Sequence, residues 1–353
     1  MEMRLIPVFD GHNDVLLRLW MKKSATAVQE FIDGDGKGHL DLPRMLAGGF
    51  AGGMFAIFVP HPDEKPPDES DLNPPLPGEI RLPTALGPAL GMAALLARIE
   101  RAAPDRFSIC RSVGEIRAAM AAGRVAAVMH VEGAECIDEN FESLDVLHAA
   151  GLRSLGPVWS RPNIFGHGVP FRFPSLPDTG PGLTELGREL VRQCNARHIL
   201  VDLSHITERG FWEVAEVSTA PLVATHSNAH ALSASSRNLT DAQIKAIGAS
   251  GGVIGLNFAN GFLRGDGRWA SENGLDTMLR HLDHLMNLAG EDHVGLGSDF
   301  DGARIPSQIG DVSGLPRLTD AMAAHGYGEA LVEKIASKNW LAALERTWGE
   351  AAV

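Results

Sequence analysis

The stretch ILVDLSHITERGFWEVAEVSTAPLVATHS, residues 199–227, contains one complete repeat of the pattern that decides the fold. Short apolar runs rich in β-branched residues stand near its two ends, over 199–204 and 222–225, and a longer segment separates them. Such an alternation is typical of parallel strands joined by crossover helices. Each run is followed at once by a histidine, His205 in one case and His226 in the other.

The same alternation extends along most of the chain and predicts eight strands. They are Ile6–Asp10, Met54–Val59, Val125–Val131, Gly151–Val158, Ile199–Ser204, Leu222–Thr225, Val253–Asn257 and Val294–Ser298. Between them, Leu190 and Cys194 share one helical face, and Thr240 with Gln243 has the spacing of a capping box. Eight strand–helix units over roughly 300 residues favour an α/β fold of the (β/α)8 TIM-barrel type. An open doubly wound sheet is disfavoured because no Gly-rich dinucleotide fingerprint follows any predicted strand.

Two stretches interrupt the alternation, each directly after a predicted strand, where barrel enzymes carry the loops that shape the active site. Pro60–Pro83 is rich in Pro, Asp and Glu, and Trp159–Gly182 reads WSRPNIFGHGVPFRFPSLPDTGPG. Each is a candidate lid, and a solvated surface insertion is an equally good interpretation of Pro60–Pro83. Gly302–Val353 is predicted to be a helical tail that packs outside the barrel, so that residues 1–353 form a single domain.

The composition of the chain narrows the class of partner. Its 353 residues are 44% hydrophobic and 21% charged, which is ordinary for a globular protein with a large core. A formal net charge of −13 argues against nucleic acids and anionic membranes and so favours a small-molecule substrate. The three cysteines Cys110, Cys136 and Cys194 are widely spaced and odd in number, which suits a reducing, cytoplasmic location. A homodimer is the default expectation for a soluble enzyme.

Side chains of the kind that bind metals recur at the carboxyl ends of the predicted strands, where a barrel displays its catalytic groups. They are His12 and Asp14 after the first strand, Glu132 after the third, His205 after the fifth, His226 after the sixth and Asp299 after the eighth. Any one of these residues alone is more often a core residue with satisfied hydrogen bonds. Random placement would not favour one strand end, so the set together predicts a metal centre.

The spacing of these residues assigns ligands to two ions. His12 and Asp14 are two residues apart, so on an extended segment they face the same side and can hold one ion together. His205 and His226 come from neighbouring strands and can hold a second ion, while the two oxygens of Glu132 can bridge both. Two divalent ions about 3.5–4 Å apart can share and acidify a water. Imidazole and carboxylate ligands without cysteine favour Zn2+, with Mn2+ and Fe2+ also compatible.

Two further histidines lie near these positions and are interpreted as structural. His130 shares a strand face with Glu132, and His230 lies in the loop after the sixth strand. Buried histidines commonly satisfy local hydrogen bonds or support a ligand from behind. We therefore expect neither of the two to bind metal.

Six sequence blocks, read together, resemble the membrane (renal) dipeptidase family, peptidase family M19 of the amidohydrolase superfamily. The blocks are FDGHND (9–14), HVEGAE (130–135), VDLSH (201–205), THSNAH (225–230), SSRNLTD (235–241) and HVGLGSDFDG (293–302). Ser337–Leu341 is also similar to the family's Gly-Gly-Asn-aromatic-Leu segment, with its glycines replaced. A His-x-Asp on a first strand is shared by the whole superfamily, whereas six blocks in order over most of the chain are specific.

The resemblance implies a binuclear metal-dependent dipeptidase that hydrolyses free dipeptides, including those with a C-terminal D-residue, by attack of a metal-bridging hydroxide. It implies that Glu132 bridges the two zinc ions, in place of the carbamylated lysine of many superfamily relatives. Asp299 would take a proton from the bridging water and pass it to the leaving amine. Arg237 would bind the free C-terminal carboxylate of the substrate.

One position departs from the family pattern. Where the family often has a histidine that polarises the scissile carbonyl, this chain has Trp159, which we interpret as a wall of the substrate pocket. His167 and Asn163, in the following loop, are candidates for the missing donor. Arg161 and Arg172 in the same loop are either solvated or contacts for an acidic substrate side chain.

Two other functions stay open on the sequence alone. The same metal pair could open a lactone, a β-lactam or a cyclic amide, because an activated water attacks any well-placed carbonyl. The other alternative is a catalytically silent metal-binding barrel, against which the complete ligand set and Asp299 both argue.

Overall fold

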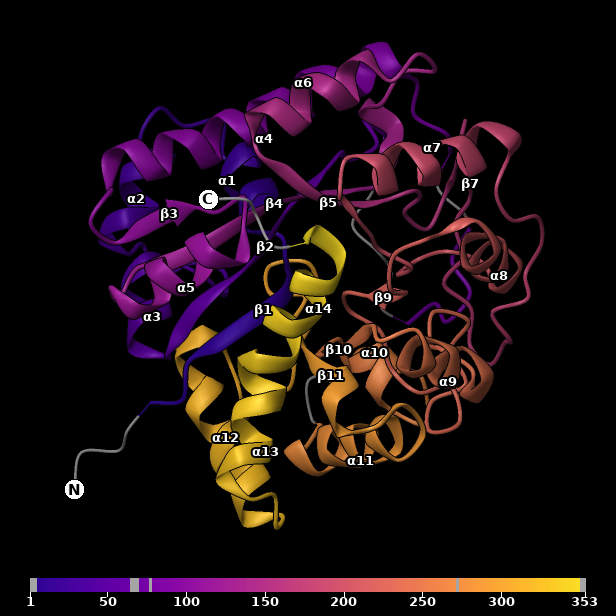
Figure 1. Ribbon diagram of the computed structural model, residues 1–353. Helices are drawn as coiled ribbons and strands as arrows, with labels where there is room; N and C mark the ends of the chain where they lie inside the picture. The colour runs from indigo at the N-terminus through magenta and orange to yellow at the C-terminus, as the bar shows by residue number, and fades with distance from the viewer. Residues whose placement is uncertain (1–4, 64–69, 76–77, 271–272, 350–353) are drawn as a thin grey trace.

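Eight parallel strands form a barrel that helices surround (Figure 1). In this computed structural model the described residues are 5–63, 70–75, 78–270 and 273–349. The barrel strands are β1 (Val8–Asn13), β2 (Phe50–Phe58), β4 (Val125–Glu132), β5 (Leu152–Gly156), β8 (Leu200–Val201), β9 (Val223–Ala224), β10 (Val253–Asn257) and β11 (Val294–Gly297). They pair in the order β8-β5-β4-β2-β1-β11-β10-β9, and a parallel bridge between Asp202 and Val223 joins the two ends. The predicted (β/α)8 barrel is therefore confirmed.

Each predicted barrel strand is present, and the differences lie at the strand ends. β1 continues to Asn13, so His12 lies inside the strand rather than after it. β8 ends at Val201, although the backbone pairing continues for two residues: the backbone N of Asp202 donates to the carbonyl of Leu155 at 2.9 Å, and that of Leu203 donates to the carbonyl of Val223 at 2.8 Å. The side chain of Asp202 adds to this pairing, since its Oδ1 accepts from the backbone N of Thr225 at 2.8 Å.

Three short strands are not predicted by the sequence patterns. β3 (Phe107–Ile109) pairs with β4 outside the barrel order, and β6 (Pro162–Asn163) and β7 (Gly166–His167) form an antiparallel hairpin. Strands of two or three residues are too short to show a period. The hairpin lies within Trp159–Gly182, the second predicted interruption.

Helices form the outer layer of the molecule (Figure 1). They are α1 (Val15–Met21), α2 (Ala27–Asp33), α3 (Leu42–Ala47), α4 (Leu82–Ala102), α5 (Val113–Ala121), α6 (Glu142–Ala150), α7 (Glu185–Ala196), α8 (Glu208–Val217), α9 (Asp241–Ala249), α10 (Asn260–Leu263), α11 (Leu275–Ala289), α12 (Leu315–Ala324), α13 (Glu329–Glu333) and α14 (Asn339–Trp348). Leu190 and Cys194 are buried on α7, and Thr240 and Gln243 form the predicted capping box of α9. Within the described residues, α4 alone is long and apolar enough to cross a membrane, and here it packs against α1, α2 and β3.

The C-terminal segment is helical, as predicted, but it does not pack wholly outside the barrel. α14 lies over the centre of the ring of strands in Figure 1. Its residue Trp340 is fully buried in one cluster with strand residues such as Phe9, and Nε1 donates to the carbonyl of Leu296 at 2.9 Å. Glycines leave room for the indole, since a Cβ at Gly11 or Gly295 would lie 2.4 or 2.5 Å from it. The tail therefore plugs the barrel at the amino ends of its strands.

The first predicted interruption, Pro60–Pro83, lies between β2 and α4. Its residues 64–69 and 76–77 are outside the described part of the chain, and the described remainder contains no helix or strand before α4 begins at Leu82. Several of its residues line the cavity at the carboxyl ends of the strands, where a barrel carries its active site.

Candidate metal centre

Five polar side chains meet at the carboxyl ends of the barrel strands. Glu132 Oε1 lies at their centre, 3.1 Å from His205 Nε2, 3.5 Å from His226 Nε2 and 3.7 Å from His12 Nε2. Asp14 Oδ2 is 3.3 Å from His12 Nε2. Each of the five residues is buried. The structure thus brings together all five ligands predicted from the sequence.

The local backbone presents these side chains in unusual conformations. His12 lies near the end of β1, and Asp14 is the N-cap of α1, so one short turn of chain supplies both. His205 has a φ of 66° and Asp299 a φ of 57°, the left-handed region that favours glycine. A non-glycine residue in this region costs about 1–3 kcal/mol and is concentrated at functional sites. Four other non-glycine residues, Lys23, Phe141, His198 and Asp301, also have positive φ, so the strain at His205 and Asp299 accompanies the side-chain cluster without being confined to it.

Neighbouring hydroxyl groups orient two of the histidines. Ser160 Oγ lies 2.8 Å from His205 Nδ1, and Thr225 Oγ1 lies 2.8 Å from His226 Nδ1. Thr225 Oγ1 also donates to Asp202 Oδ2 at 2.6 Å. Because these contacts occupy Nδ1, the Nε2 atom of each ring, which faces Glu132, is the one left to bind a metal.

The buried carboxylates of the cluster favour a bound cation. Both ring nitrogens of His12 are buried without a hydrogen bond among the described residues. Burial acts to lower the pKa of His12, but the charges of Glu132 and Asp14 outweigh it and raise the pKa to about 10. Burial also raises the pKa of Glu132 well above its ordinary value, although His12 opposes that shift. Clustered buried carboxylates require positive charge beside them, and a divalent cation supplies it.

The other two histidines already have the protonation state of metal ligands. Burial lowers the pKa of His205 and of His226 well below the ordinary value, so both imidazoles are neutral at pH 7. Three imidazoles and two carboxylates form a donor set that suits zinc and related divalent ions. The residues present therefore fit a metal centre.

Asp299 reaches the same space from the loop after β11. A carboxylate oxygen of Asp299 lies within 4.8 Å of the ligand atoms of His12 and Asp14. Its Oδ2 accepts a hydrogen bond from Asn257 Nδ2 at 3.0 Å. Burial, reinforced by the charge of Asp14, raises the pKa of Asp299 to about 6. A carboxyl group that titrates near neutral pH can accept and return a proton.

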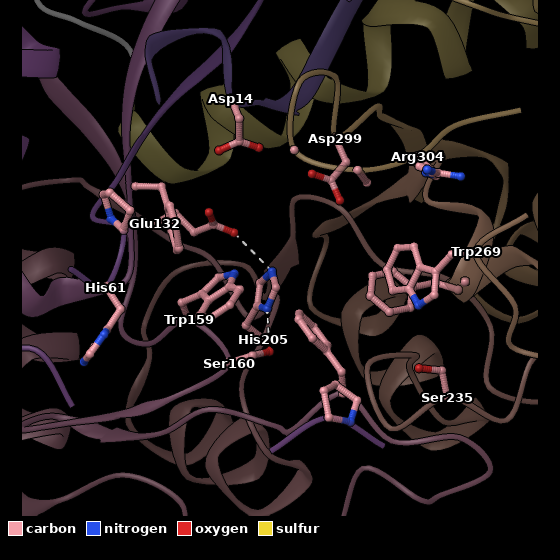
Figure 2. A pocket seen from close by; sticks show the side chains of 18 of the residues that line it. Asp14, His61, Glu132, Trp159, Ser160, His205, Ser235, Trp269, Asp299 and Arg304 are labelled. Atoms are coloured by element: carbon pink, nitrogen blue, oxygen red, sulfur yellow. Dashed lines mark hydrogen bonds and ion pairs between the residues drawn. The ribbon is translucent and has the colours of Figure 1, made fainter. Parts of the chain in front are cut away.

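A cavity of about 860 Å³ opens onto these side chains (Figure 2). Figure 2 shows the carboxylates of Asp14, Glu132 and Asp299 pointing into one central space, with His205 on its opposite side. Trp159 lies on the cavity wall, as the sequence leads us to expect. Both interruptions of the strand–helix pattern contribute wall residues, so they shape the site.

The structure does not bring His167 and Asn163 to this cavity. Asn163 Nδ2 donates to the carbonyl of Pro157 at 2.9 Å, and its Oδ1 accepts from two backbone amides of the hairpin. His167 Nδ1 lies 3.2 Å from the carbonyl of Gly182. Neither side chain lines the cavity. Both are used to hold the β6–β7 hairpin, so the expectation that one of them polarises the scissile carbonyl has no structural support.

Arg161 is neither solvated nor a substrate contact. It is fully buried, its Nε donates to Glu135 Oε1 at 2.6 Å, and its Cζ lies 5.0 Å from the ring centres of Phe58 and Trp159. It therefore supports Trp159 from behind. Arg172, by contrast, is exposed at the cavity wall, and within the described residues its side chain makes no hydrogen bond or ion pair.

Arg237 is 3% exposed and lies beside the metal cluster, although it does not line the cavity. Nη1 donates to Ser227 Oγ at 2.8 Å, Nη2 donates to the carbonyl of His226 at 2.9 Å, and Cζ lies 5.7 Å from the ring of Phe262. Burial lowers the pKa of Arg237 to about 10, so the guanidinium stays charged. Within the described residues its Nε has no hydrogen bond and no carboxylate forms an ion pair with it.

The two histidines interpreted as structural do occupy supporting positions. His130 Nδ1 lies 2.8 Å from Ser154 Oγ, and the His130 ring meets that of His12 edge-on with centroids 5.4 Å apart. His230 Nε2 lies 2.9 Å from the carbonyl of Ser175.

Other residues of the site are missed by the sequence interpretation. Asn257 ends the seventh predicted strand, so its position at a strand end could have indicated it. Ser160 and Trp269 lie in irregular segments, where chain position carries no information on which way a side chain faces. Phe262 lies in α10, a helix of four residues that is too short to show a helical period.

Comparisons with known proteins agree with this geometry. The sequence profile described as membrane dipeptidase (peptidase family M19) matches residues 3–351. The crystal structure of the dipeptidase AC, a metallopeptidase of family M19, is similar with a TM-score of 0.94 and 57% identity, over 98% of this chain and 100% of that one. A metallopeptidase from Rhodobacter sphaeroides, liganded with a phosphinate mimic of the dipeptide L-Ala-D-Ala, has a TM-score of 0.94 and 56% identity at the same coverage. An uncharacterized protein in the pqqA 5' region of Klebsiella pneumoniae is 48% identical over 255 residues, 72% of this chain and 94% of its own length.

Proposed function

This chain belongs to peptidase family M19, the membrane dipeptidases, and is a metal-dependent dipeptidase; from this premise we propose that it cleaves free dipeptides with two divalent ions. The observation that carries the proposal is the convergence of three imidazole nitrogens on one oxygen of Glu132, at 3.1, 3.5 and 3.7 Å. Glu132 lies between the pair His12 and Asp14 and the pair His205 and His226, which is the position of a carboxylate that bridges two ions.

Each ion has its own set of ligands in this proposal. His12 and Asp14 hold one ion, His205 and His226 hold the other, and Glu132 belongs to both. Zn2+ is the favoured metal because the set contains imidazoles and no thiolate, and Mn2+ or Fe2+ would fit the same donors. When bound, such a pair acidifies a shared water and polarises the scissile carbonyl.

Asp299 moves the proton in this scheme. Its carboxylate lies beside the ligands, and the Asn257 amide holds one of its oxygens at 3.0 Å, which leaves the other oxygen to take a proton from the attacking water. The same carboxyl group then gives that proton to the amine of the leaving amino acid.

Arg237 is proposed to anchor the C-terminal carboxylate of the dipeptide. Among the described residues no carboxylate pairs with this buried guanidinium, and burying an unpaired charge costs folding free energy. A substrate carboxylate would supply the missing partner in a charge-assisted pair. The stacked ring of Phe262 connects Arg237 to the cavity wall. A lactone or cyclic amide would leave this charge without a partner, which favours dipeptides over those substrates.

We further propose that the C-terminal residue of the substrate can have the D configuration. The relative from Rhodobacter sphaeroides, 56% identical, binds a phosphinate mimic of L-Ala-D-Ala, which supports this choice. The experiment is to load the purified enzyme with Zn2+ or Mn2+ and offer a library of free L-L and L-D dipeptides. Release of free amino acids is expected, and no turnover of any member at full metal occupancy would contradict the proposal.

A cytoplasmic location remains part of the proposal. Cys110, Cys136 and Cys194 are buried free thiols, which suits a reducing compartment. Fractionation of the native host, with the enzyme appearing in the soluble cytoplasmic fraction, is the expected result.

A further inference from the structure

Five aromatic side chains form a continuous row along the wall of the cavity, and we call this row the aromatic arc. In order, its members are Phe58, Trp159, Phe171, Phe262 and Trp269. Successive ring centroids lie 5.0, 5.5, 5.7 and 5.0 Å apart, mostly in edge-to-face or tilted contact. The rings come from three separate parts of the chain, around residues 58, 159–171 and 262–269, so the arc is a product of the fold rather than of a local sequence run.

The aromatic arc passes directly beside the proposed metal ligands. The ring of His205 is 5.7 Å from that of Trp159 and 6.0 Å from that of Phe171. Figure 2 shows Trp159 next to His205 and Trp269 on the far side of the same cavity. A substrate whose scissile bond lies at the metal centre therefore places at least one of its side chains against these rings.

Three of the five rings of the arc keep exposed surface, while Phe58 and Phe262 are buried. Trp159, Phe171 and Trp269 are each only partly buried, and all three line the cavity. Apolar surface left open in an enclosed site is covered favourably by an apolar ligand group. A large ring surface offers much more area to a leucine or phenylalanine side chain than to an alanine methyl.

Both ends of the arc are held in place by specific contacts. Phe58, at one end, and its neighbour Trp159 both pack on the buried guanidinium of Arg161, whose Nε donates to Glu135 at 2.6 Å. Trp269 lies flat over Gly261, where a Cβ would be 2.6 Å from the indole. Fixed rings lose little side-chain entropy when a ligand packs on them, which strengthens their contribution to binding.

We propose that the aromatic arc is a specificity subsite that selects dipeptides with one bulky apolar side chain. This inference rests on the proposed dipeptidase function and adds the class of substrate. The same cavity also allows the alternative that the enzyme prefers a substrate with an acidic side chain, which would pair with the exposed guanidinium of Arg172. The arc is favoured because two of its rings lie within 6.0 Å of the ring of His205, whereas among the described residues no hydrogen bond or ion pair joins the Arg172 side chain to a proposed metal ligand.

The test compares kcat/KM across a small panel of L-D dipeptides with the metal-loaded enzyme. The panel contains L-Ala-D-Ala and versions in which leucine, phenylalanine or glutamate replaces alanine at one position or the other. We expect the best leucine or phenylalanine substrate to exceed L-Ala-D-Ala by about 10- to 100-fold, the value of burying a large apolar side chain. Glutamate substrates should not exceed L-Ala-D-Ala.

Variants at Trp269 connect this preference to the arc. Trp269→Ala should reduce the preference for bulky residues to within about threefold of L-Ala-D-Ala, because the removed ring supplied the apolar area. Gly261→Ala, which displaces the same ring without removing it, should reduce the preference in the same direction. Trp212→Ala is the matched control, since Trp212 is 37% exposed on α8 outside the cavity, and it should keep the wild-type preference.

The outcomes separate this inference from the proposed function. No turnover of any dipeptide would contradict the dipeptidase proposal itself. Turnover of L-Ala-D-Ala without a preference for bulky apolar residues, or a preference for glutamate, would overturn the subsite alone. A strong preference that Trp269→Ala leaves intact, with metal content and thermal midpoint unchanged, would also overturn it.

Discussion

Glu132 is the residue on which the proposed two-ion site depends most, because its one carboxylate is proposed to bind both ions. It ends β4 and is 5% exposed, and three histidines lie within 3.7 Å of its Oε1. We predict that Glu132→Gln lowers bound metal from two ions per chain to one or fewer and reduces kcat/KM by at least about 10³-fold. Metal analysis after gel filtration, together with dipeptide kinetics, measures both effects.

The matched control for this change is Glu139→Gln, since Glu139 is exposed in a turn away from the site. It should leave metal content and activity as in the wild type. Full metal content with Glu132→Gln would show that the carboxylate does not bridge the ions.

Loss of Arg237 should affect substrates with a free C-terminal carboxylate and spare those without one. With Arg237→Ala, kcat/KM for a free dipeptide should fall by about 10²- to 10³-fold, because a buried charge-assisted pair with the substrate carboxylate is lost. The same variant should act on the corresponding dipeptide amide, which has no carboxylate, about as well as the wild type does. Equal losses on both substrates would instead assign Arg237 to support of Ser227 and the His226 backbone.

Single residues differ in how far the sequence could predict them. The convergence of the five proposed ligands was predictable because each lies at or just after the end of an apolar run, and the carboxyl ends of barrel strands face a common centre. Asn163, His167 and Arg161 lie in a long loop, where the sequence gives the position but not the direction of a side chain. In the structure, the side chains of Asn163 and His167 lie within hydrogen-bonding distance of backbone carbonyls of the loop, and Arg161 donates to Glu135.

Among the elements, α14 closes the barrel at the end opposite the proposed metal centre. Trp340→Ala would leave a cavity among Gly11, Gly295 and the inward strand residues. We predict a loss of about 3–5 kcal/mol of stability, seen as a lower thermal midpoint. Trp212→Ala on the outer surface is the control and should change the midpoint little; equal shifts in both variants would contradict the role of α14 as a plug.

Helix α6 provides a prediction with a defined pH dependence. Asp138 accepts hydrogen bonds from Ser143 Oγ and from backbone amides at the start of α6. Burial acts to raise the pKa of Asp138, but these hydrogen bonds outweigh it and lower the pKa to about 2. A carboxyl group whose pKa is lowered on folding stabilises the fold at neutral pH and loses this effect as the pH falls toward that pKa.

The corresponding experiment is a pair of thermal melts at pH 7 and pH 3. Asp138→Ala should lower stability by about 1 kcal/mol at pH 7, as for the loss of a helix cap, and by less at pH 3. Asp105→Ala, at an exposed turn, should have little effect at either pH. A difference between wild type and Asp138→Ala that grows toward pH 3 would contradict the assignment.

The elements show where local pattern is a sufficient guide. Long apolar runs such as β4 and β10 were predicted to within a residue of their ends, because several residues in succession share one environment. β8 was predicted too long because only Leu200 and Val201 keep regular strand pairing, and the residues after them join β9 through the single bridge between Asp202 and Val223. α14 was predicted as a helix, but its place in the barrel depends on the shape left by distant glycines, which no local window contains.

At the scale of the whole molecule, barrel closure is what assembles the site. β1 pairs with β11, and the backbone N of Asp299 donates to the carbonyl of His12 at 3.0 Å. The first and last strands therefore present His12, Asp14 and Asp299 together, while strands from the middle of the chain supply Glu132, His205 and His226. The barrel was predictable because its unit recurs eight times, but the cavity was not, because its wall comes from loops that share no pattern.

The central claim is that the assembled centre works with two ions on a free dipeptide. The most direct measurement is a titration of metal-free protein with Zn2+ while the hydrolysis of L-Ala-D-Ala is followed at each addition. The account predicts that the rate rises until two ions are bound per chain and then stays constant. A full rate at one ion per chain, or no hydrolysis with two ions bound, would contradict it.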